Sequence, residues 1–475
     1  MTLPEGWEMV VGLEVHTELK TATKMFCGCP NEFGAEANTH ICPVCLGLPG
    51  SLPVLNVRAV DLAMAIGFAL HSTIGFSTFH RKNYFYPDMP KDFQISQYDL
   101  PINKGGYLDL PDGSRVSIER AHLEEDTGKS THLGGSGRIH GADRSLVDYN
   151  RSGVPLVEIV SGPDIRSSAQ ARAYASELRG ILIATGASDG RMEEGSMRID
   201  ANVSVHHPEE PFGTRCEIKN LNSLRSLVRA IDYEALRQIE LLEGGGTVRQ
   251  ETRHWDENLE ATSTMRTKEE AEDYRYFREP DLVDLTPDAA WQERISRSLG
   301  TMPAERRQLL LARLSNPTSA QLDALNVVID LGFDDYVFAA LDAEVDGGLA
   351  LARAANELAS DIDHRDNLST EAYVATLKME QGGELSATQA KTVLLEVLGH
   401  GGDPREVAQS KGFEQLSTDS LEATVDGLIA QYPGEWSRYR DGDDKLAQFF
   451  IGQVMKVTKG QANGKAVIAQ LQSRR

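Results

Sequence analysis

Residues 10–19, V-V-G-L-E-V-H-T-E-L, alternate between apolar and polar side chains with a period of two. This spacing is typical of a β-strand that buries one of its faces. Leu13, Val15, Thr17 and Leu19 would lie on one face, and Glu14, His16 and Glu18 on the other. The polar face is either a solvated side of an antiparallel sheet or part of a site.

Two further segments repeat the pattern and favour the second interpretation. Residues 196–206 place Arg198, Asp200 and Asn202 opposite an apolar face, and residues 215–222 place Arg215, Glu217 and Lys219 opposite Cys216 and Ile218. Solvated strands more often carry Thr, Ser and Lys than this mixture. We therefore expect a polar, concave sheet surface suited to a charged substrate.

Residues 118–132, I-E-R-A-H-L-E-E-D-T-G-K-S-T-H, concentrate three consecutive carboxylates next to two histidines and a lysine. Adjacent like charges repel by about 1 kcal/mol at contact in water and by more when desolvated. Such clusters usually hold a cation. The candidate metal ligands are Glu14, Glu124, Glu125 and His16.

A loop and strand at residues 148–163 add an anion-binding element. Asn150 and Arg151 precede Gly153, where the backbone can approach a ligand closely, and Glu158 interrupts an apolar strand. Arg151, Arg198 and Lys219 are the candidates for binding phosphate. Phosphoryl transfer requires carboxylates that bind Mg²⁺ and basic side chains that bind phosphate. We therefore predict a magnesium-dependent phosphoryl-transfer site.

The cysteines give a sharper signal. Cys27 and Cys29 form C-x-C, and Cys42 and Cys45 form C-x-x-C twelve residues later. Four thiols this close together favour a structural Zn²⁺ site over disulfides in a cytosolic chain. A closed four-thiolate site would stabilise the loop and take no part in catalysis.

Length and composition set the organisation. The chain has 475 residues and a formal net charge of −23, no apolar run long enough to span a bilayer, and no export signal at its start, which predicts a cytoplasmic protein without a membrane partner. The period-two spacing of apolar residues typical of strands changes to helical spacing near residue 290, which predicts a domain boundary there. The sequence H-G-G-D-P at 400–404 predicts a second domain boundary. We expect an α+β fold with domains at 1–290, 291–402 and 403–475.

The tail differs from the rest of the chain in charge. Residues 445–475 contain six basic and no acidic side chains, so an acidic body with a basic end remains compatible with a tRNA-sized partner. A solvated helix end would have the same composition.

Together these segments resemble the family of B subunits of aspartyl/glutamyl-tRNA(Asn/Gln) amidotransferases, the GatB/GatE family. The resemblance covers essentially the whole chain. It rests on V-G-L-E-V-H at 11–16, the four-cysteine loop, R-K-N-Y-F-Y-P-D-M-P-K at 81–91, H-L-E-E-D at 122–126, N-R-S-G-V-P-L-V-E-I-V at 150–160, S-M-R-I-D-A-N-V-S at 196–204, E-I-K-N-L-N-S at 217–223, D-Y-R-Y-F at 273–277 and G-Q-V-M-K at 452–456.

This resemblance implies a cradle-like catalytic domain, a helical domain and a small tail domain that holds tRNA. It also implies an ATP-dependent carbon–nitrogen ligase with glutamine as amido donor: ATP phosphorylates the side-chain carboxylate of Glu-tRNA(Gln) or Asp-tRNA(Asn), and ammonia then displaces phosphate. Glu14, His16 and Glu125, with Glu124 nearby, resemble the metal positions of the family. The expected nucleotide contacts are Asn150, Arg151, Asp200, Asn202 and Lys219.

The chain contains no paired-serine amidase signature. The resemblance therefore implies a separate glutaminase A subunit and a small C subunit in a heterotrimer. Two alternatives remain open: a non-catalytic, zinc-stapled tRNA-binding scaffold, and a free-standing ligase that uses ammonia directly.

Overall fold

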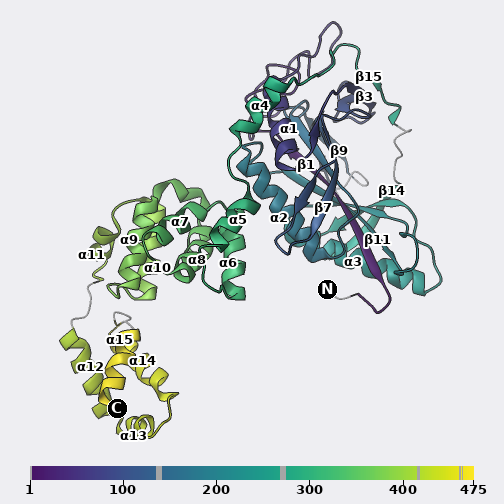
Figure 1. Cartoon of the computed structure of the whole chain (residues 1–475). Coiled ribbons are helices and arrows are strands. Elements are labelled where there is room, and N and C mark those ends of the chain that lie inside the picture. The colour runs from purple at the N-terminus through teal and green to yellow at the C-terminus, as the bar shows by residue number, and fades with distance from the viewer. Residues whose placement is uncertain (1–2, 135–141, 268–273, 414–417, 459–461, 463) are drawn as a thin grey trace. The chain divides into compact units, whose positions relative to one another are not determined.

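The computed structural model describes residues 3–134, 142–267, 274–413, 418–458, 462 and 464–475. It divides into two compact units, Met1–Ala304 and Glu305–Arg475 (Figure 1). The first unit is built on a mostly antiparallel sheet and the second is helical, which confirms the α+β prediction. The expected division into three domains stays a prediction.

One large sheet organises the first unit. Its main path runs β14-β13-β12-β11-β1-β10-β7-β4-β3-β15, and all its neighbours pair antiparallel except β12 and β13. The bounds are β1 Glu8–Glu18, β3 Phe79–Asn83, β4 Phe93–Gln97, β7 Arg115–Glu125, β10 Pro155–Ser161, β11 Met197–His206, β12 Cys216–Leu221, β13 Glu251–Asp256, β14 Ala261–Thr267 and β15 Phe277–Arg278. Off this path, the short strands β5 Asn103–Lys104 and β6 Tyr107–Asp109 pair with β7, and β2 Thr73–Ile74 pairs with β5. A separate two-stranded sheet consists of β8 Lys129–Leu133 and β9 Arg144–Asp148.

Helices cover one face of this sheet. α1 (Val57–Ala69) packs on β7, α3 (Leu224–Glu243) packs on β11, and α2 (Ser168–Ala184) contacts both helices. Each begins at an Asn or Ser whose side chain accepts a hydrogen bond from a free backbone N–H of the first turn. The predicted inward residues of the central strands are buried beneath them, with Leu13 and Val203 at most 1% exposed. The opposite face is left to the polar side chains.

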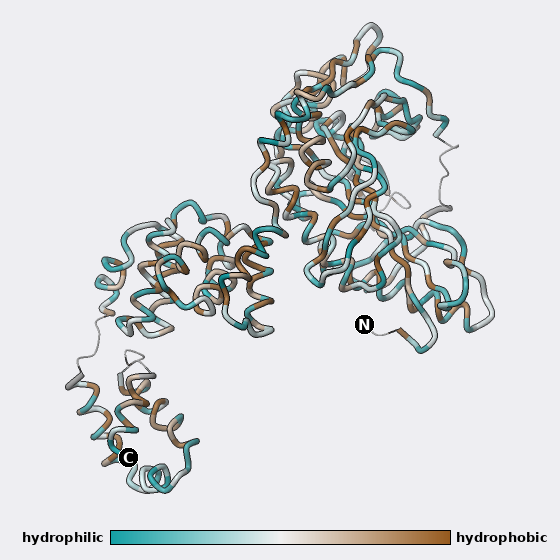
Figure 2. The backbone as a smooth tube through the Cα atoms, viewed as in Figure 1, coloured by the Kyte–Doolittle hydropathy of each residue, from teal (hydrophilic) through white to brown (hydrophobic). Residues whose placement is uncertain are grey.

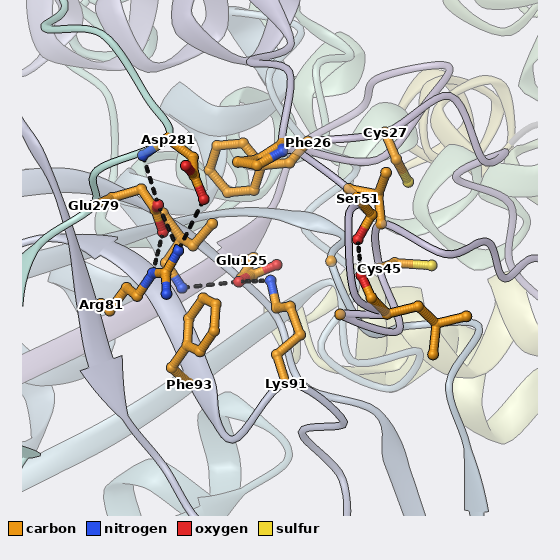
Figure 3. A pocket seen from close by; sticks show the side chains of 16 residues that line it. Phe26, Cys27, Cys45, Ser51, Arg81, Lys91, Phe93, Glu125, Glu279 and Asp281 are labelled. Atoms are coloured by element: carbon orange, nitrogen blue, oxygen red, sulfur yellow. Dashed lines mark hydrogen bonds and ion pairs between the residues drawn. The ribbon is translucent and has the colours of Figure 1, made fainter.

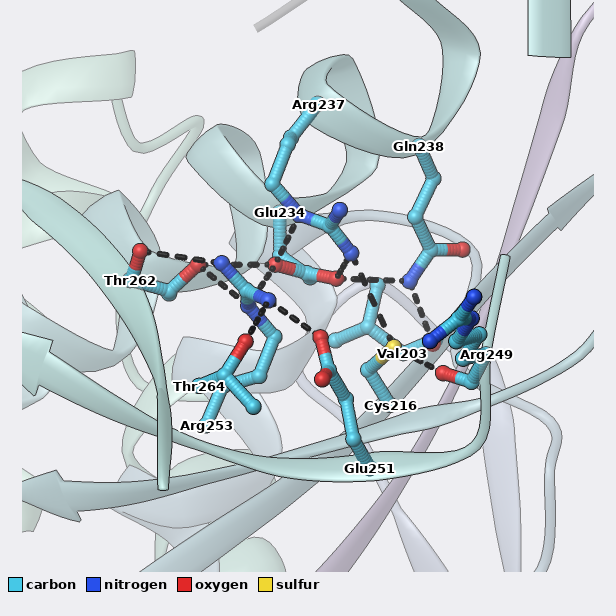
Figure 4. A network of polar contacts seen from close by, with 10 residues as sticks. All are labelled: Val203, Cys216, Glu234, Arg237, Gln238, Arg249, Glu251, Arg253, Thr262 and Thr264. Carbon is cyan, nitrogen blue, oxygen red and sulfur yellow. Dashed lines mark hydrogen bonds and ion pairs between the residues drawn. The ribbon is translucent and has the colours of Figure 1, made fainter. Parts of the chain in front are cut away.

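A buried polar network fixes α3 to the β13–β14 hairpin (Figure 4). The carboxylate of Glu234, fully buried, accepts hydrogen bonds from Arg237 at 2.6 and 3.0 Å, Gln238 at 2.9 Å and Thr262 at 2.9 Å. The guanidinium of Arg253 lies 3.2 Å from the same carboxylate. Because every oxygen of this carboxylate is paired, its burial is compensated.

The second unit consists of helices in which apolar and polar residues alternate along the chain (Figure 2). Their bounds are α5 Pro303–Leu311, α6 Ser319–Asp330, α7 Asp334–Asp342, α8 Gly347–Asn356, η2 Leu358–Ser360, η3 Ile362–Asn367, α9 Thr370–Gln381, α10 Ala387–His400, α11 Pro404–Ser410, α12 Thr418–Gln431, α13 Pro433–Arg440, α14 Leu446–Val457 and α15 Gly464–Arg474, and α4 Ala289–Ser298 precedes them in the first unit. The buried residues form two clusters, one from Leu310 to Ala408 and one from Leu421 to Leu471.

Candidate active site

Strand register brings the predicted polar residues together on the open face of the sheet. On β1, Glu14 pairs with Asp200 of β11, while His16 pairs with Glu158 of β10 on one side and with Arg198 on the other. Glu158 in turn pairs with His122 of β7. Strand pairing therefore produces a row of charged groups across β7, β10, β1 and β11, of which β1 and β11 carry the alternation predicted from the sequence.

A first cluster contains His16, Glu124 and Glu158, with ligand atoms within 4.8 Å of one another. His16 Nε2 lies 3.5 Å from a Glu158 oxygen, and His122 Nε2 lies 3.6 Å from that oxygen and 3.8 Å from Glu124. Ser96 donates a 3.2 Å hydrogen bond to Glu124. We call His16, Glu124 and Glu158 the histidine–acid cluster.

Electrostatics couple the members of this cluster. Burial alone would lower the pKa of His16, but the hydrogen bond and charge of Glu158, with Asp200 and Glu124, raise it to about 9. Burial would raise the pKa of Glu158, but the charges of His122 and His16 hold it well below its usual range. Without a bound cation the cluster is thus an ion-paired assembly, and a metal ligated at His16 must displace its proton.

A second cluster lies next to it and contains Glu14, Asp200 and Glu217, again within 4.8 Å. Lys219 binds Asp200 at 2.5 Å and lies 3.3 Å from Glu217, so the predicted phosphate-binding lysine offsets part of the negative charge of this cluster. Burial opposes the charge on Lys219, but Asp200 and Glu217 raise its pKa. We call Glu14, Asp200 and Glu217 the carboxylate cluster.

Hydrogen bonds orient two carboxylates of this cluster from neighbouring strands. Asn202 donates a 2.9 Å hydrogen bond to Glu14. The buried hydroxyl of Thr252, on β13, donates a 2.8 Å hydrogen bond to Glu217. A cavity of about 310 Å³ opens beside Glu14 and Asn202 and is also lined by Ser204, Phe212 and Arg215.

The two predicted arginines share one acidic partner. Arg198 forms an ion pair with Asp126, which is buried, and Arg151 lies 3.5 Å from the same carboxylate. Arg151 also donates hydrogen bonds to the carbonyls of Thr127 and Gly128, at 2.9 and 3.0 Å. Burial and the charge of Asp126 raise the pKa of Glu18, the next acid along β1, to about 8. Binding of a phosphate by these arginines would therefore require an exchange of partners.

The structure does not bring Glu125 to either cluster, contrary to the expected metal set. Because side chains alternate along β7, Glu124 faces the open side and Glu125 faces the helix-covered side. There Glu125 pairs with Lys91 and accepts a 2.8 Å hydrogen bond from the backbone N–H of Ile95 (Figure 3). This pair lines a cavity of about 170 Å³ that also contains Arg81, bound to Glu279, and the loop of Cys27 and Cys45.

The four predicted cysteine ligands do gather. The sulfurs of Cys27, Cys29, Cys42 and Cys45 lie within 4.8 Å of one another, and the backbone N–H of Cys42 lies 3.1 Å from the sulfur of Cys45. Their hydrogen bonding already favours one thiolate, since the contact with Cys27 lowers the pKa of Cys45 to about 5. This donor set could hold a metal, and tetrahedral thiolate coordination is what structural zinc prefers.

Asn150 holds this cysteine loop in place. Its side-chain oxygen accepts a hydrogen bond from the backbone N–H of His40 at 2.8 Å, and its amide donates to the carbonyl of Glu36 at 2.7 Å. The predicted nucleotide contact at Asn150 is thus engaged in structural hydrogen bonds. Four residues near the clusters have no role assigned from the sequence: Glu158, His122, Lys82 and Glu217. Two of them could have been found, because Glu158 is an acid within an apolar strand and Glu217 alternates onto the same strand face as Lys219.

In the tail, two of the six basic residues are ion-paired within the domain, Arg474 with Asp426 and Arg475 with Asp444. Lys445 and Lys456 are exposed. Lys459 and the side chain of Lys465 lie outside the described residues. Ion pairing thus leaves less free positive charge on the described tail than its composition suggests.

An open sheet face with clustered acids, histidines and lysines, beside a four-thiol loop, has the character of a catalytic domain. Family models agree on the class: residues 9–293 match the GatB/GatE catalytic domain and residues 349–474 match the GatB domain. The chain belongs to the GatB/GatE family.

Curated relatives extend this match over nearly the full length. The chain is similar to the B subunit of the aspartyl/glutamyl-tRNA(Asn/Gln) amidotransferase of Frankia casuarinae, with 49% identity over 97% of this chain and 94% of the relative. The B subunits of the same name from Carboxydothermus hydrogenoformans and Moorella thermoacetica are each 46% identical, over 97% and 98% of this chain and 97% and 99% of their own length. Among the described residues, no helix is long and apolar enough to cross a membrane.

Proposed function

We propose that this chain is the kinase and transamidase subunit of a tRNA-dependent amidotransferase. It uses ATP to phosphorylate the side-chain carboxylate of Glu-tRNA(Gln) or Asp-tRNA(Asn), and ammonia then displaces the phosphate to form the amide. The observation that carries the proposal is the row of charged residues on the open face of the sheet, in a chain that matches amidotransferase B subunits over nearly its full length. A carboxylate is a poor electrophile at neutral pH, and phosphorylation overcomes this.

The residues present fit Mg²⁺, which prefers oxygen ligands. The carboxylates of the two clusters, with His16, would hold it, and bound Mg²⁺ would neutralise charge on the phosphates of ATP. Lys219 supplies a positive charge beside the carboxylate cluster. Lys82 supplies another beside the histidine–acid cluster. Burial opposes the charge on Lys82, but the charges of Glu124 and Glu158 raise the pKa of Lys82 and keep it protonated. The cavity beside Glu14 and Asn202 is the best place for the nucleotide, since Asp200 lies within 4.8 Å of Glu14 and Lys219 binds Asp200.

Zinc is the metal that we assign to the four-cysteine loop. Its role is structural, because four sulfur ligands leave no open coordination position. The glutaminase would reside on a separate A subunit, with a small C subunit completing the complex. The basic tail would contact tRNA.

The test is ATP turnover by the complex reconstituted with A and C subunits and Mg²⁺. We expect phosphate release with Glu-tRNA(Gln) or Asp-tRNA(Asn) and none with correctly charged Gln-tRNA(Gln). A scaffold without catalytic function would release no phosphate with any of these tRNAs, and a free-standing ligase would work with ammonium salts in the absence of the A subunit.

Glu158→Gln is the variant that best separates the enzyme from the scaffold. Glu158 connects His16 and His122 on the open face, so its loss should abolish phosphate release while leaving tRNA affinity nearly unchanged. Glu125 is less suitable, because it holds Lys91 in a buried pair whose loss would destabilise the fold. Glu193→Gln, at an exposed position, is the matched control.

A further inference from the structure

The tyrosines of the D-Y-R-Y-F segment lie beside the histidine–acid cluster and have no role in the chemistry above. Tyr276 immediately precedes β15, in which Phe277 pairs with Arg81 of β3. Arg81 faces the cavity of Figure 3, so Lys82 faces the open side, where its ammonium lies 4.8 Å from the ring centroid of Tyr274. The segment therefore borders the edge of the open face.

Tyr276 forms a parallel stack with Tyr98. Their ring centroids are 4.2 Å apart and the ring planes differ by 9°. His80 packs with its ring edge toward Tyr98 at 6.0 Å. Tyr98 nevertheless remains 46% exposed, so the stack ends at solvent. An exposed, preformed aromatic stack is the kind of surface on which proteins bind unpaired nucleic-acid bases.

The Tyr98–Tyr276 stack lies close enough to the acids of the histidine–acid cluster to interact with them electrostatically. His80 pairs with Ser96, which donates to Glu124, so β3 and β4 connect the stack to the cluster. Burial and the charges of Glu124 and Glu158 raise the pKa of Tyr276. An amino acid esterified to a terminal ribose carries its side-chain carboxylate only about 7 Å from that ribose. The base of the terminal nucleotide must therefore bind close to the reacting groups.

We propose that the Tyr98–Tyr276 stack receives the adenine of the 3′-terminal adenosine of the aminoacyl-tRNA. The ATP adenine is assigned elsewhere, because the cavity beside Glu14 has the size for a small molecule and contains neither ring of the stack, whereas Tyr98 is exposed and accessible to a large one. In this position Lys82 would lie next to the esterified amino acid and could neutralise its carboxylate. This inference rests on the proposed function.

Steady-state kinetics of the complete complex test it, with Tyr98→Ala, Tyr98→Phe and the control Tyr86→Ala, a similarly exposed tyrosine that packs on Tyr84 instead. We expect Tyr98→Ala to raise KM for the misacylated tRNA about tenfold, a factor within the range for one stacked base. Tyr98→Phe and Tyr86→Ala should keep the wild-type KM, and KM for ATP should stay constant in all three. An unchanged KM for tRNA, or a rise confined to KM for ATP, would overturn the proposal.

A binding measurement adds a readout that does not need turnover. In a tRNA that carries 2-aminopurine in place of the terminal adenine, stacking should quench the fluorescence on binding to the wild-type complex and less so with Tyr98→Ala. Equal quenching by both proteins would contradict the inference. If the wild-type complex shows no tRNA-dependent phosphate release, the proposed function fails; if it does and Tyr98→Ala behaves normally, only the stacking platform fails.

Discussion

Replacing Glu234 by glutamine removes the charge at the centre of the buried network of Figure 4 while keeping the shape of the side chain. Arg237 and Arg253 would lose their shared counter-ion. The glutamine amide would have only one oxygen that accepts hydrogen bonds, where the carboxylate has two. Removing one partner of a buried ion pair typically costs about 3 to 5 kcal/mol. We expect the lower end, about 3 kcal/mol, because Arg253 retains Glu251 and the side chain of Arg237 is 23% exposed and can be hydrated.

Urea unfolding followed by tryptophan fluorescence measures this loss, since Trp255 is buried on β13 within the affected region. Burial opposes ionisation of Glu234, but the hydrogen bonds from Arg237 and Gln238 lower its pKa below that of the unfolded chain. Its contribution is therefore present above the unfolded pKa and disappears as pH falls through the folded one. The wild type and Glu234→Gln should differ at pH 7 and converge in acid.

Glu240→Gln is the control, because Glu240 lies on the same helix and is exposed. Its unfolding free energy should match the wild type within about 0.5 kcal/mol. If Glu234→Gln cost less than about 1 kcal/mol, or kept its full effect at low pH, the buried charge would not be what holds α3 to the hairpin.

The remaining predictions concern metal, packing and backbone. Thr252→Val should weaken Mg²⁺ activation of phosphate release about 10- to 100-fold by freeing Glu217, whereas Thr252→Ser should not; equal effects of both would assign the loss to packing. Elemental analysis should find one zinc per chain, and Cys45→Ser should remove it and increase protease cleavage of the loop; zinc retained at full occupancy would contradict a four-sulfur site. Lys91→Met should destabilise the fold by about 3 kcal/mol in a denaturant titration, and adding Glu125→Gln should recover part of this loss, whereas additive losses would deny the pairing. Gly106→Ala should cost at least about 2 kcal/mol, because the added methyl carbon would lie 2.3 Å from the carbonyl of Leu70 at a positive φ, whereas Gly113→Ala, in open space, should cost about 1 kcal/mol.

Much of the site could be predicted because a period of two is a local property. The alternation in residues 10–19 already separated Leu13 and Val15 from Glu14 and His16, and the sheet keeps that separation. The cysteine spacing likewise predicted four sulfurs at one place.

What the sequence could not provide is the pairing between strands. Glu158 meets both His16 and His122 only because β10 lies between β1 and β7, and His16 is more than a hundred positions from Glu158 in the sequence. The same periodicity, applied to residues 118–126, would have separated Glu124 from Glu125; the density of charge drew attention to all three acids as one set. The engagement of Arg151 and Arg198 by Asp126 depends on a similar long-range contact.

Strand β7 uses both of its faces at once, with Glu124 directed to the reacting side and Glu125 to the enclosed cavity on the other. A shift of one residue in its register would exchange the two environments and turn Leu123 outward. A single deleted codon within residues 120–126 should therefore damage the open site and the buried ion pair together. A deletion scan scored for growth would show these positions as a short, intolerant window.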